Sequence, residues 1–495
     1  MTHALPPDLR RRRFLRNGAY GSSALLLPAW LGGCGNSGGG QPVAPVEPPV
    51  LPPVTPPPPK FAPRGTHLSW TADPLTTRTA TWFTDGEDAP VSAIEFGPVS
   101  AGMSAADIAS APLPGRAEAS TSATPGVASF THKASAAGLD PNLPMRYRVG
   151  SAQAWSPVRV VRPTPAGEEF RFCHFGDHGI GPSSSTVLRA AAARQPDFLL
   201  IAGDLSYANG DQPLWDDYVN ALEADYAASG ILLTAPGNHE EEDNNGATYR
   251  NRFACKTSTL SPDGTFYSFD LGRCHFVIST GGCFATDGTL ASEIAFLETD
   301  LAQAALRRAA GEIDFIIVSQ HFTIWTDNEG RNPNNPTLVL LQENIFVRYG
   351  VDLLAVGHDH IYQRSQPMAF GQPNPLGYVQ VTAGTGGKGF YVLLPQSAWS
   401  AFGLQDSHVF TEYSISRGAI TAVSRSVDPA TGATAVIDEF SIPRRSLGAA
   451  NAAVQPVRSL ARLGQSFDAN YELLARRTRA ANRMKLAACA QPSHV

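Results

Sequence analysis

Five short motifs in the middle of the chain each place a possible metal ligand directly after an apolar strand. In one of them, Gly203-Asp204-Leu205-Ser206-Tyr207 follows the apolar run 198–202, which is too short for a helix and is typical of a buried strand. Gly203 lets the backbone turn, and a carboxylate and a phenol then leave the carboxyl end of the strand, where open α/β sheets collect ligands. A carboxylate can bridge two cations, and a phenolate suits a hard, highly charged metal.

The other four motifs add carboxylate, amide and imidazole groups after further apolar strands. They are Gly176-Asp177-His178-Gly179, Gly237-Asn238-His239-Glu240, Val318-Ser319-Gln320-His321 and Gly357-His358-Asp359-His360. A lone Gly-Asp or Gly-His usually marks a turn, and a lone His at a strand end is usually a hydrogen-bonded polar group. Because all five motifs end strands of one predicted sheet system, their side chains can converge on one edge. The ordered set therefore predicts a metal centre.

The elements that must position these motifs form two predicted domains. Residues 61–165 contain short strands separated by Gly, Pro and Asp, which favours a β-sandwich with Trp70 and Trp82 in its core. His67 and His132 are isolated there, so we expect solvated or hydrogen-bonded histidines. From residue 166 to 443, strands alternate with helical segments, which predicts an α/β domain with two sheets. Its expected elements include helices at 184–194 and 214–228 and a hairpin of strands 266–271 and 274–280.

Composition excludes some classes of function. The 495 residues carry a net charge of −6 and 43% hydrophobic residues, so neither a disordered chain nor a nucleic-acid binder is indicated. The six cysteines lack C-x-x-C spacing, which argues against a zinc ribbon or a redox motif. One pair among Cys255, Cys274 and Cys283 could form a disulfide in an oxidising compartment, and the sequence does not say which.

The amino terminus predicts export to a bacterial cell envelope. Residues 1–34 place Arg11-Arg12-Arg13-Phe14-Leu15-Arg16 before a modest apolar region, which resembles a twin-arginine signal. Leu31-Gly32-Gly33-Cys34 looks like a lipoprotein box, with Cys34 acylated in the mature periplasmic or membrane-anchored protein; the alternative is ordinary secretion with an unmodified Cys34. Residues 35–60 are a Gly- and Pro-rich tether.

The carboxyl-terminal tail, residues 444–495, is Ala- and Arg-rich, and Asp468 could cap a helix there. Such a basic helix could contact an anionic surface, but a solvated or self-packed helix is the favoured interpretation.

In this order, the five motifs resemble those of the purple acid phosphatases, a branch of the metallophosphoesterases. The resemblance extends from residue 61 to about residue 443 and includes Gly384-Thr385-Gly386-Gly387-Lys388-Gly389. Tyr207 is its specific element, because general metallophosphoesterases lack that phenolate. The resemblance implies an αββα metallophosphoesterase sandwich preceded by a fibronectin-III-like β-sandwich domain.

The resemblance also implies a binuclear metal centre. The implied ligands are Asp177, Tyr207 and His360 for Fe(III), Asn238, His321 and His358 for a divalent ion, and Asp204 as the bridge. Three anionic oxygens offset most of the charge of a trivalent ion, whereas an amide and two neutral imidazoles suit Zn²⁺, Fe²⁺ or Mn²⁺. Two metals roughly 3.5–4 Å apart can hold both an attacking hydroxide and a phosphate oxygen. The implied reaction is the hydrolysis of small phosphomonoesters by a hydroxide bound at this Fe(III)–M(II) centre.

Further roles follow from the resemblance. His239, like Asn238, would contact the substrate phosphate and would stabilise the transition state or donate a proton. We expect Glu240 to orient His239, and the rest of the run 240–243 to be a solvated turn. His178 could line the pocket or lie on the surface.

One feature departs from the family pattern. Plant members carry further histidines about ten residues after the fourth-motif histidine, and these help protonate the leaving group. This chain has none between His321 and His358, where Asp327, Glu329 and Arg331 stand instead. The general acid is therefore unassigned. A phosphodiesterase with the same centre, or a catalytically silent metalloprotein that binds phosphorylated ligands, remain the alternatives.

Overall fold

The computed structural model describes residues 61–86, 88–284, 289–329, 331, 335, 338–369 and 371–445, all within one compact unit. The predicted export signal with Cys34, the tether and nearly all of the basic tail lie outside these residues. None of the described helices is long and apolar enough to cross a membrane.

The first described segment is all-β apart from the short helix α1 (Ala105–Ser110). Its antiparallel strands form two four-stranded sheets of order β1-β2-β6-β5 and β4-β3-β7-β8. The strands are β1 (Arg64–Ser69), β2 (Thr77–Asp85), β3 (Ser92–Pro98), β4 (Gly115–Glu118), β5 (Ser120–Ala123), β6 (Ser129–Ala137), β7 (Met145–Ser151) and β8 (Arg159–Val161). Trp70 and Trp82 are buried in the core, as predicted, but the Trp70 ring packs against Phe198 and Phe269 of the α/β part. His67 and His132 are also buried and hydrogen-bonded, not solvated.

Two mixed sheets follow, of order β11-β10-β9-β21-β22-β23 and β12-β13-β14-β15-β19-β16-β20. The strands of the first are β9 (Phe170–Phe175), β10 (Phe198–Ala202), β11 (Leu232–Ala235), β21 (His408–Ile415), β22 (Ala419–Val427) and β23 (Thr434–Pro443). Those of the second are β12 (Tyr267–Leu271), β13 (Cys274–Ile278), β14 (Phe315–Gln320), β15 (Leu353–Val356), β16 (Tyr362–Ser365), β19 (Val379–Ala383) and β20 (Ser400–Leu404). The two-residue strands β17 (Met368–Ala369) and β18 (Gln372–Pro373) form a separate ribbon. The predicted hairpin is confirmed, because β12 and β13 pair antiparallel.

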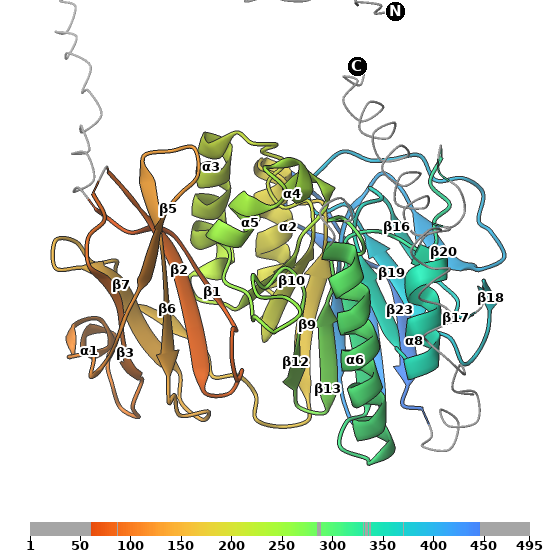
Figure 1. Ribbon diagram of the computed structural model, residues 1–495, viewed down its shortest axis with the longest axis horizontal. Coiled ribbons are helices and arrows are strands. Elements are labelled where there is room, and N and C mark those ends of the chain that lie inside the picture. The colour runs from red at the N-terminus through yellow and green to blue at the C-terminus, as the bar shows by residue number, and fades with distance from the viewer. Residues whose placement is uncertain are drawn as a thin grey trace, which may run out of the picture. The chain divides into compact units, whose positions relative to one another are not determined.

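The sheets pack face to face between layers of helices (Figure 1). Strand β10 shows why its sequence is apolar throughout: Phe198 and Leu200 belong to the core between the sheets, whereas Leu199 and Ile201 belong to the core under α2 and α3. The first sheet is covered by α2 (Pro182–Ala192) and α3 (Gln212–Leu222), and α3 continues into the π-helical turn η1 (Glu223–Ala227). The second sheet is covered by α6 (Thr289–Ala309) and α8 (Asn344–Tyr349), and α8 follows the π-helical turn η2 (Val339–Glu343). The two short helices α4 (Asn238–Glu242) and α5 (Ala247–Arg252) follow β11.

The β-rich segment is held to the α/β part by buried polar contacts, with β1 lying beside α3 (Figure 1). The fully buried side chain of Arg252 pairs with Asp216 at 2.7 Å, and Asp216 also pairs with Arg64 of β1 at 2.9 Å. The hydroxyl of Tyr147 donates to the Ala228 carbonyl at 2.7 Å. The Arg64–Asp216 pair and the Tyr147 hydrogen bond cross the junction, so they help to fix how the two parts meet.

The predicted disulfide is wrong for the described residues, since Cys173, Cys255, Cys274 and Cys283 are all free. Cys274 lies in the core between the sheets, and Cys283 lies in the core on the outer face of the second sheet. The sheet itself therefore separates these two thiols, although they are close in sequence. Cys173 and His174 are fully buried, as expected for core residues.

Candidate metal centre

The five motifs follow strands that run parallel within their sheets. Asp177, Asp204 and Asn238 come directly or closely after β9, β10 and β11, which pair parallel. His321 follows β14, and His358 and His360 follow its parallel neighbour β15. The carboxyl ends of both sheets therefore present these side chains at one edge of the fold.

Four of the predicted ligand residues have a left-handed backbone, which side-chain-bearing residues rarely adopt. The φ angles are 57° at Asp177, 51° at Asp204, 56° at Tyr207 and 69° at His358. Such strain costs on the order of 1 kcal/mol or more per residue and persists where surrounding structure imposes it. Its concentration in the motifs indicates that the turns are shaped to aim these side chains.

Asp177, Tyr207 and His360 form the first cluster. The Tyr207 hydroxyl lies 2.8 Å from Asp177 Oδ1 and 3.0 Å from His360 Nε2, and His360 Nε2 lies 3.2 Å from Asp177 Oδ1. His360 Nδ1 donates to the Gly389 carbonyl at 2.7 Å, which leaves the Nε2 lone pair facing the oxygens. The ring of Tyr391 stacks on His360 at 4.1 Å.

Asp204, His321 and His358 form the second cluster, and one ligand atom from each lies within 4.8 Å of the others. His321 Nε2 is 3.2 Å from Asp204 Oδ2 and 3.1 Å from His358 Nδ1. His321 Nδ1 donates to the Ala202 carbonyl at 2.8 Å, so Nε2 is again the free ligand atom. Asn238 Oδ1 is buried and has no hydrogen-bond partner within the described part of the chain.

The two clusters are joined at Asp177, whose Oδ2 accepts the backbone N–H of His358 at 2.6 Å. Burial and the carboxylates of Asp177 and Asp204 raise the pKa of the Tyr207 phenol well above its usual value. Burial opposes charge on His321, but Asp204 outweighs it and raises the pKa of the imidazole to about 9. The charge of Asp204 thus acts on one residue of each cluster. Groups whose pKa values are raised beside carboxylates, such as Tyr207 and His321, are groups at which metal cations can replace protons.

The donor set fits two metal ions. Two carboxylates, a phenol and three imidazoles converge, with the Nε2 lone pairs of His321 and His360 facing the site. The buried Asn238 oxygen lacks the partner that buried polar atoms normally have. The first cluster is rich in oxygen donors, Asp177 and Tyr207, and suits a hard ion. The second cluster, with two imidazoles, suits a borderline divalent ion.

His239 lies beside both clusters, with its ring 4.3 Å from that of Tyr207 and its Nε2 3.7 Å from Asp204 Oδ2. Its Nδ1 meets Asn209 Oδ1 at 2.5 Å. Asn209 was not predicted from the sequence, where its only signal is its position two residues after Tyr207. In the structure, Asn209 has a left-handed backbone with a φ of 49°. Asn209 therefore fixes the His239 ring with Nε2 on the metal side.

Glu240 does not orient His239, contrary to the expectation. Its buried carboxylate accepts the backbone N–H groups of Gly237, Asp204 and Leu205 at 2.7, 2.9 and 2.9 Å. Burial and the nearby Asp204 raise its pKa to about 8. The run 240–243 is likewise no solvated turn, because it lies in or directly after α4 and Asp243 is buried against the Trp215 indole N–H.

His178 is neither a pocket-lining nor a surface histidine. Its ring is buried and lies 3.2 Å from the Tyr218 hydroxyl and 2.9 Å from the Ser184 carbonyl, and burial lowers its pKa to about 4. It braces the first motif against α2 and α3.

Two cationic side chains that the sequence did not assign also reach the site. Lys388 Nζ lies 4.3 Å from the centre of the Tyr207 ring, and Arg331 contacts His358 and pairs with Asp359 at 2.7 Å.

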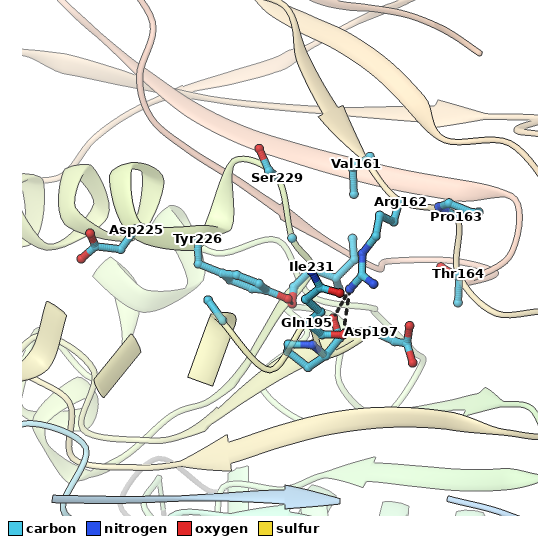
Figure 2. Close-up of a pocket in the computed structure, with 13 residues that line it drawn as sticks. Val161, Arg162, Pro163, Thr164, Gln195, Asp197, Asp225, Tyr226, Ser229 and Ile231 are labelled. Atoms are coloured by element: carbon cyan, nitrogen blue, oxygen red, sulfur yellow. Dashed lines mark hydrogen bonds between the residues drawn. The ribbon is translucent and has the colours of Figure 1, made fainter. Parts of the chain in front are cut away.

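A separate cavity of about 270 Å³ beside β8 contains none of these residues. Figure 2 shows its Arg162 reaching toward Gln195, and that guanidinium donates to the Gln195 and Pro196 carbonyls.

The chain is similar to known proteins over both parts. Residues 170–362 match the family model "Calcineurin-like phosphoesterase", and residues 63–162 match "Purple acid Phosphatase, N-terminal domain". Acid phosphatase type 7 of Homo sapiens is 29% identical over 369 residues, which cover 66% of this chain and 79% of that protein. Purple acid phosphatase 21 of Arabidopsis thaliana is 27% identical over 278 residues, or 53% of this chain; the match spans only 61% of that relative's length.

Solved structures show the same fold. A purple acid phosphatase from yellow lupin (Lupinus luteus) seeds has a TM-score of 0.67 at 20% identity, with 81% of this chain and 78% of that chain covered. PhoD has a TM-score of 0.55 at 14% identity, with coverage of 79% and 92%. The fold is thus that of the calcineurin-like metallophosphoesterases, with a β domain before it. With both family models matched in order, the chain is similar to the purple acid phosphatases over both of its described parts.

Proposed function

We propose that the protein is an exported acid phosphatase that hydrolyses small phosphomonoesters at a binuclear Fe(III)–M(II) centre. The observation that supports this most directly is the convergence of the predicted ligand side chains in two clusters joined through Asp177. Asp177, Tyr207 and His360 would hold Fe(III), and Asn238, His321 and His358 would hold Zn²⁺, Fe²⁺ or Mn²⁺, with Asp204 between them. When bound, the two metals would supply Lewis acidity and a water acidified for attack on phosphorus.

The chain's own residues would orient the ester and manage its charge. His239 is fixed by Asn209 at Nδ1, so its Nε2 can carry or accept a proton next to the phosphoryl group. Asn238 would use its amide to position a phosphate oxygen as well as the divalent ion. Because phosphoryl transfer needs mainly positioning and neutralisation of charge, no side-chain nucleophile is required.

The location is part of the same proposal. The arginine-rich segment 11–16 and the box ending at Cys34 support export to the cell envelope, with Cys34 as the lipid-bearing first residue of the mature protein. The only contact with a membrane would then be that anchor. Labelling with a radioactive fatty acid should mark the wild type and not Cys34→Ser.

The phosphatase activity can be tested with two chromogenic esters. The metal-loaded protein should release phosphate from p-nitrophenyl phosphate faster than it cleaves bis-p-nitrophenyl phosphate, and Asp204→Asn should release none. Faster cleavage of the diester would make the protein a phosphodiesterase. No cleavage of either ester by the fully loaded protein would leave a silent binder of phosphorylated ligands, and the proposal would fail.

A further inference from the structure

Arg331 occupies the side of the metal centre formed by His358. Its side chain is only 10% exposed, and its Nε faces Asp359 Oδ1 at 2.7 Å. Asp359 is fully buried and also accepts from the Thr323 hydroxyl at 3.3 Å. The guanidinium is therefore held by a fixed carboxylate located between two predicted ligands, His358 and His360.

The backbone at and before Arg331 is also held in place, since the Arg331 N–H donates to the Asn328 carbonyl at 3.2 Å. The N–H of Glu329 donates to the Val392 carbonyl at 2.9 Å, and the N–H of Tyr391 donates to the His360 carbonyl at 3.0 Å. The guanidinium carbon lies 5.9 Å from the Tyr391 ring centre, and that ring stacks on His360. Arg331 is thus built into the wall of the site and is not a solvated surface cation.

With a metal bound to His358, Nη1 of Arg331 would lack a hydrogen-bond acceptor. His358 Nδ1 faces His321 Nε2 at 3.1 Å, whereas its Nε2 contacts Nη1 of Arg331. An imidazole whose Nδ1 binds a metal carries its proton on Nε2, and guanidinium nitrogens only donate. In the metal-loaded protein these two donors face each other, so Nη1 must find another acceptor beside the centre.

We propose that Arg331 is a substrate-binding residue whose guanidinium donates to a non-bridging phosphoryl oxygen while its Nε stays on Asp359. This inference rests on the proposed function and specifies the substrate contact at that site. A planar guanidinium matches phosphate oxygens well. As a positively charged hydrogen-bond donor, it would stabilise charge on the phosphoryl group.

The test is the affinity of the metal-loaded, full-length protein for inorganic phosphate, measured by isothermal titration calorimetry. Arg331→Ala should weaken phosphate binding at least about tenfold with its bound metal unchanged, and Arg331→Lys should recover part of the loss because the charge returns without the planar fork. Arg116→Ala, which removes an exposed arginine of β4, should bind phosphate within about twofold of the wild type.

Three results would overturn the inference. The first is an Arg331→Ala protein that keeps its full metal content and binds phosphate with wild-type affinity. The second is loss of bound metal in both Arg331 variants, which would make the residue structural. The third is a wild-type protein that does not bind phosphate. If the wild type binds phosphate through Arg331 but cleaves no ester, this inference stands and the proposed phosphatase activity fails.

Discussion

The carboxylate of Glu240 accepts the backbone N–H of Asp204 at 2.9 Å, although the two residues follow different strands. The same carboxylate accepts the N–H groups of Leu205 and Gly237. One buried side chain therefore ties the second motif to the third and fixes the loop from which the expected bridging ligand projects.

Replacing Glu240 should loosen this loop. Glu240→Gln turns one acceptor oxygen into an amide group that faces N–H donors, and Glu240→Ala leaves three buried donors unpaired. We expect each variant to lose about 2–4 kcal/mol of unfolding free energy and part of its metal, as measured by urea denaturation and elemental analysis. The control Glu439→Gln, on the exposed face of β23, should match the wild type. Full metal content and unchanged stability in both Glu240 variants would show that the loop does not depend on this carboxylate.

Tyr207 should give the loaded protein its colour. Burial with Asp177 and Asp204 keeps the phenol protonated without a cation, so only a strongly charged ion such as Fe(III) would bind it as phenolate. We expect a visible charge-transfer band that is absent in Tyr207→Phe. Lys388→Met should shift the band, because the ammonium group lies 4.3 Å from the phenol ring. A colourless wild type with only divalent metals would indicate a general metallophosphoesterase centre.

His239 should matter for turnover and not for metal binding. His239→Ala removes the ring next to the expected phosphoryl position and should lower kcat by about 10²–10⁴-fold. Asn209→Ala removes the acceptor at Nδ1 and should lower kcat by about 10–100-fold, because the ring is no longer held. Both variants should keep the wild-type metal content. If Asn209→Ala has normal kcat, then Asn209 does not position the ring.

A second histidine, His275, lies outside the metal centre and should make the free energy of unfolding depend on pH. His275 of β13 lies between Asp270 and Asp300, at 2.9 and 2.7 Å. Burial opposes its charge, but these carboxylates outweigh burial and raise the pKa of His275 to about 9. Since an unfolded histidine titrates near 6.5, the stabilisation is complete below about pH 6.5 and is lost as the pH rises through 9.

The expected loss is up to about 3 kcal/mol between pH 6 and pH 10, measured as unfolding free energy in urea. His275→Gln should be less stable than the wild type at pH 6 and nearly equal to it at pH 10. An identical pH dependence in both proteins would show that the His275 charge does not stabilise the fold.

The sequence alone determined the ligand-bearing motifs, since each is a local pattern: an apolar strand, then a turn residue, then a metal-ligand side chain. It also predicted an α/β domain with two sheets in which such strand ends converge on one edge, with Tyr207 among them. Local patterns failed for Glu240, because two of the N–H groups that donate to it, those of Asp204 and Leu205, follow another strand, and for the cysteines, which a sheet separates.

Only the tertiary structure decided which groups surround the ligands. Asn209 meets His239, Arg331 meets His358, and Lys388 meets Tyr207, and each pair joins loops that follow different strands. Neither residue of a pair constrains the other through the covalent chain, so no spacing or periodicity reports the contact. Their proximity arises because both sheets turn their carboxyl ends to the same edge, where the loops must pack together.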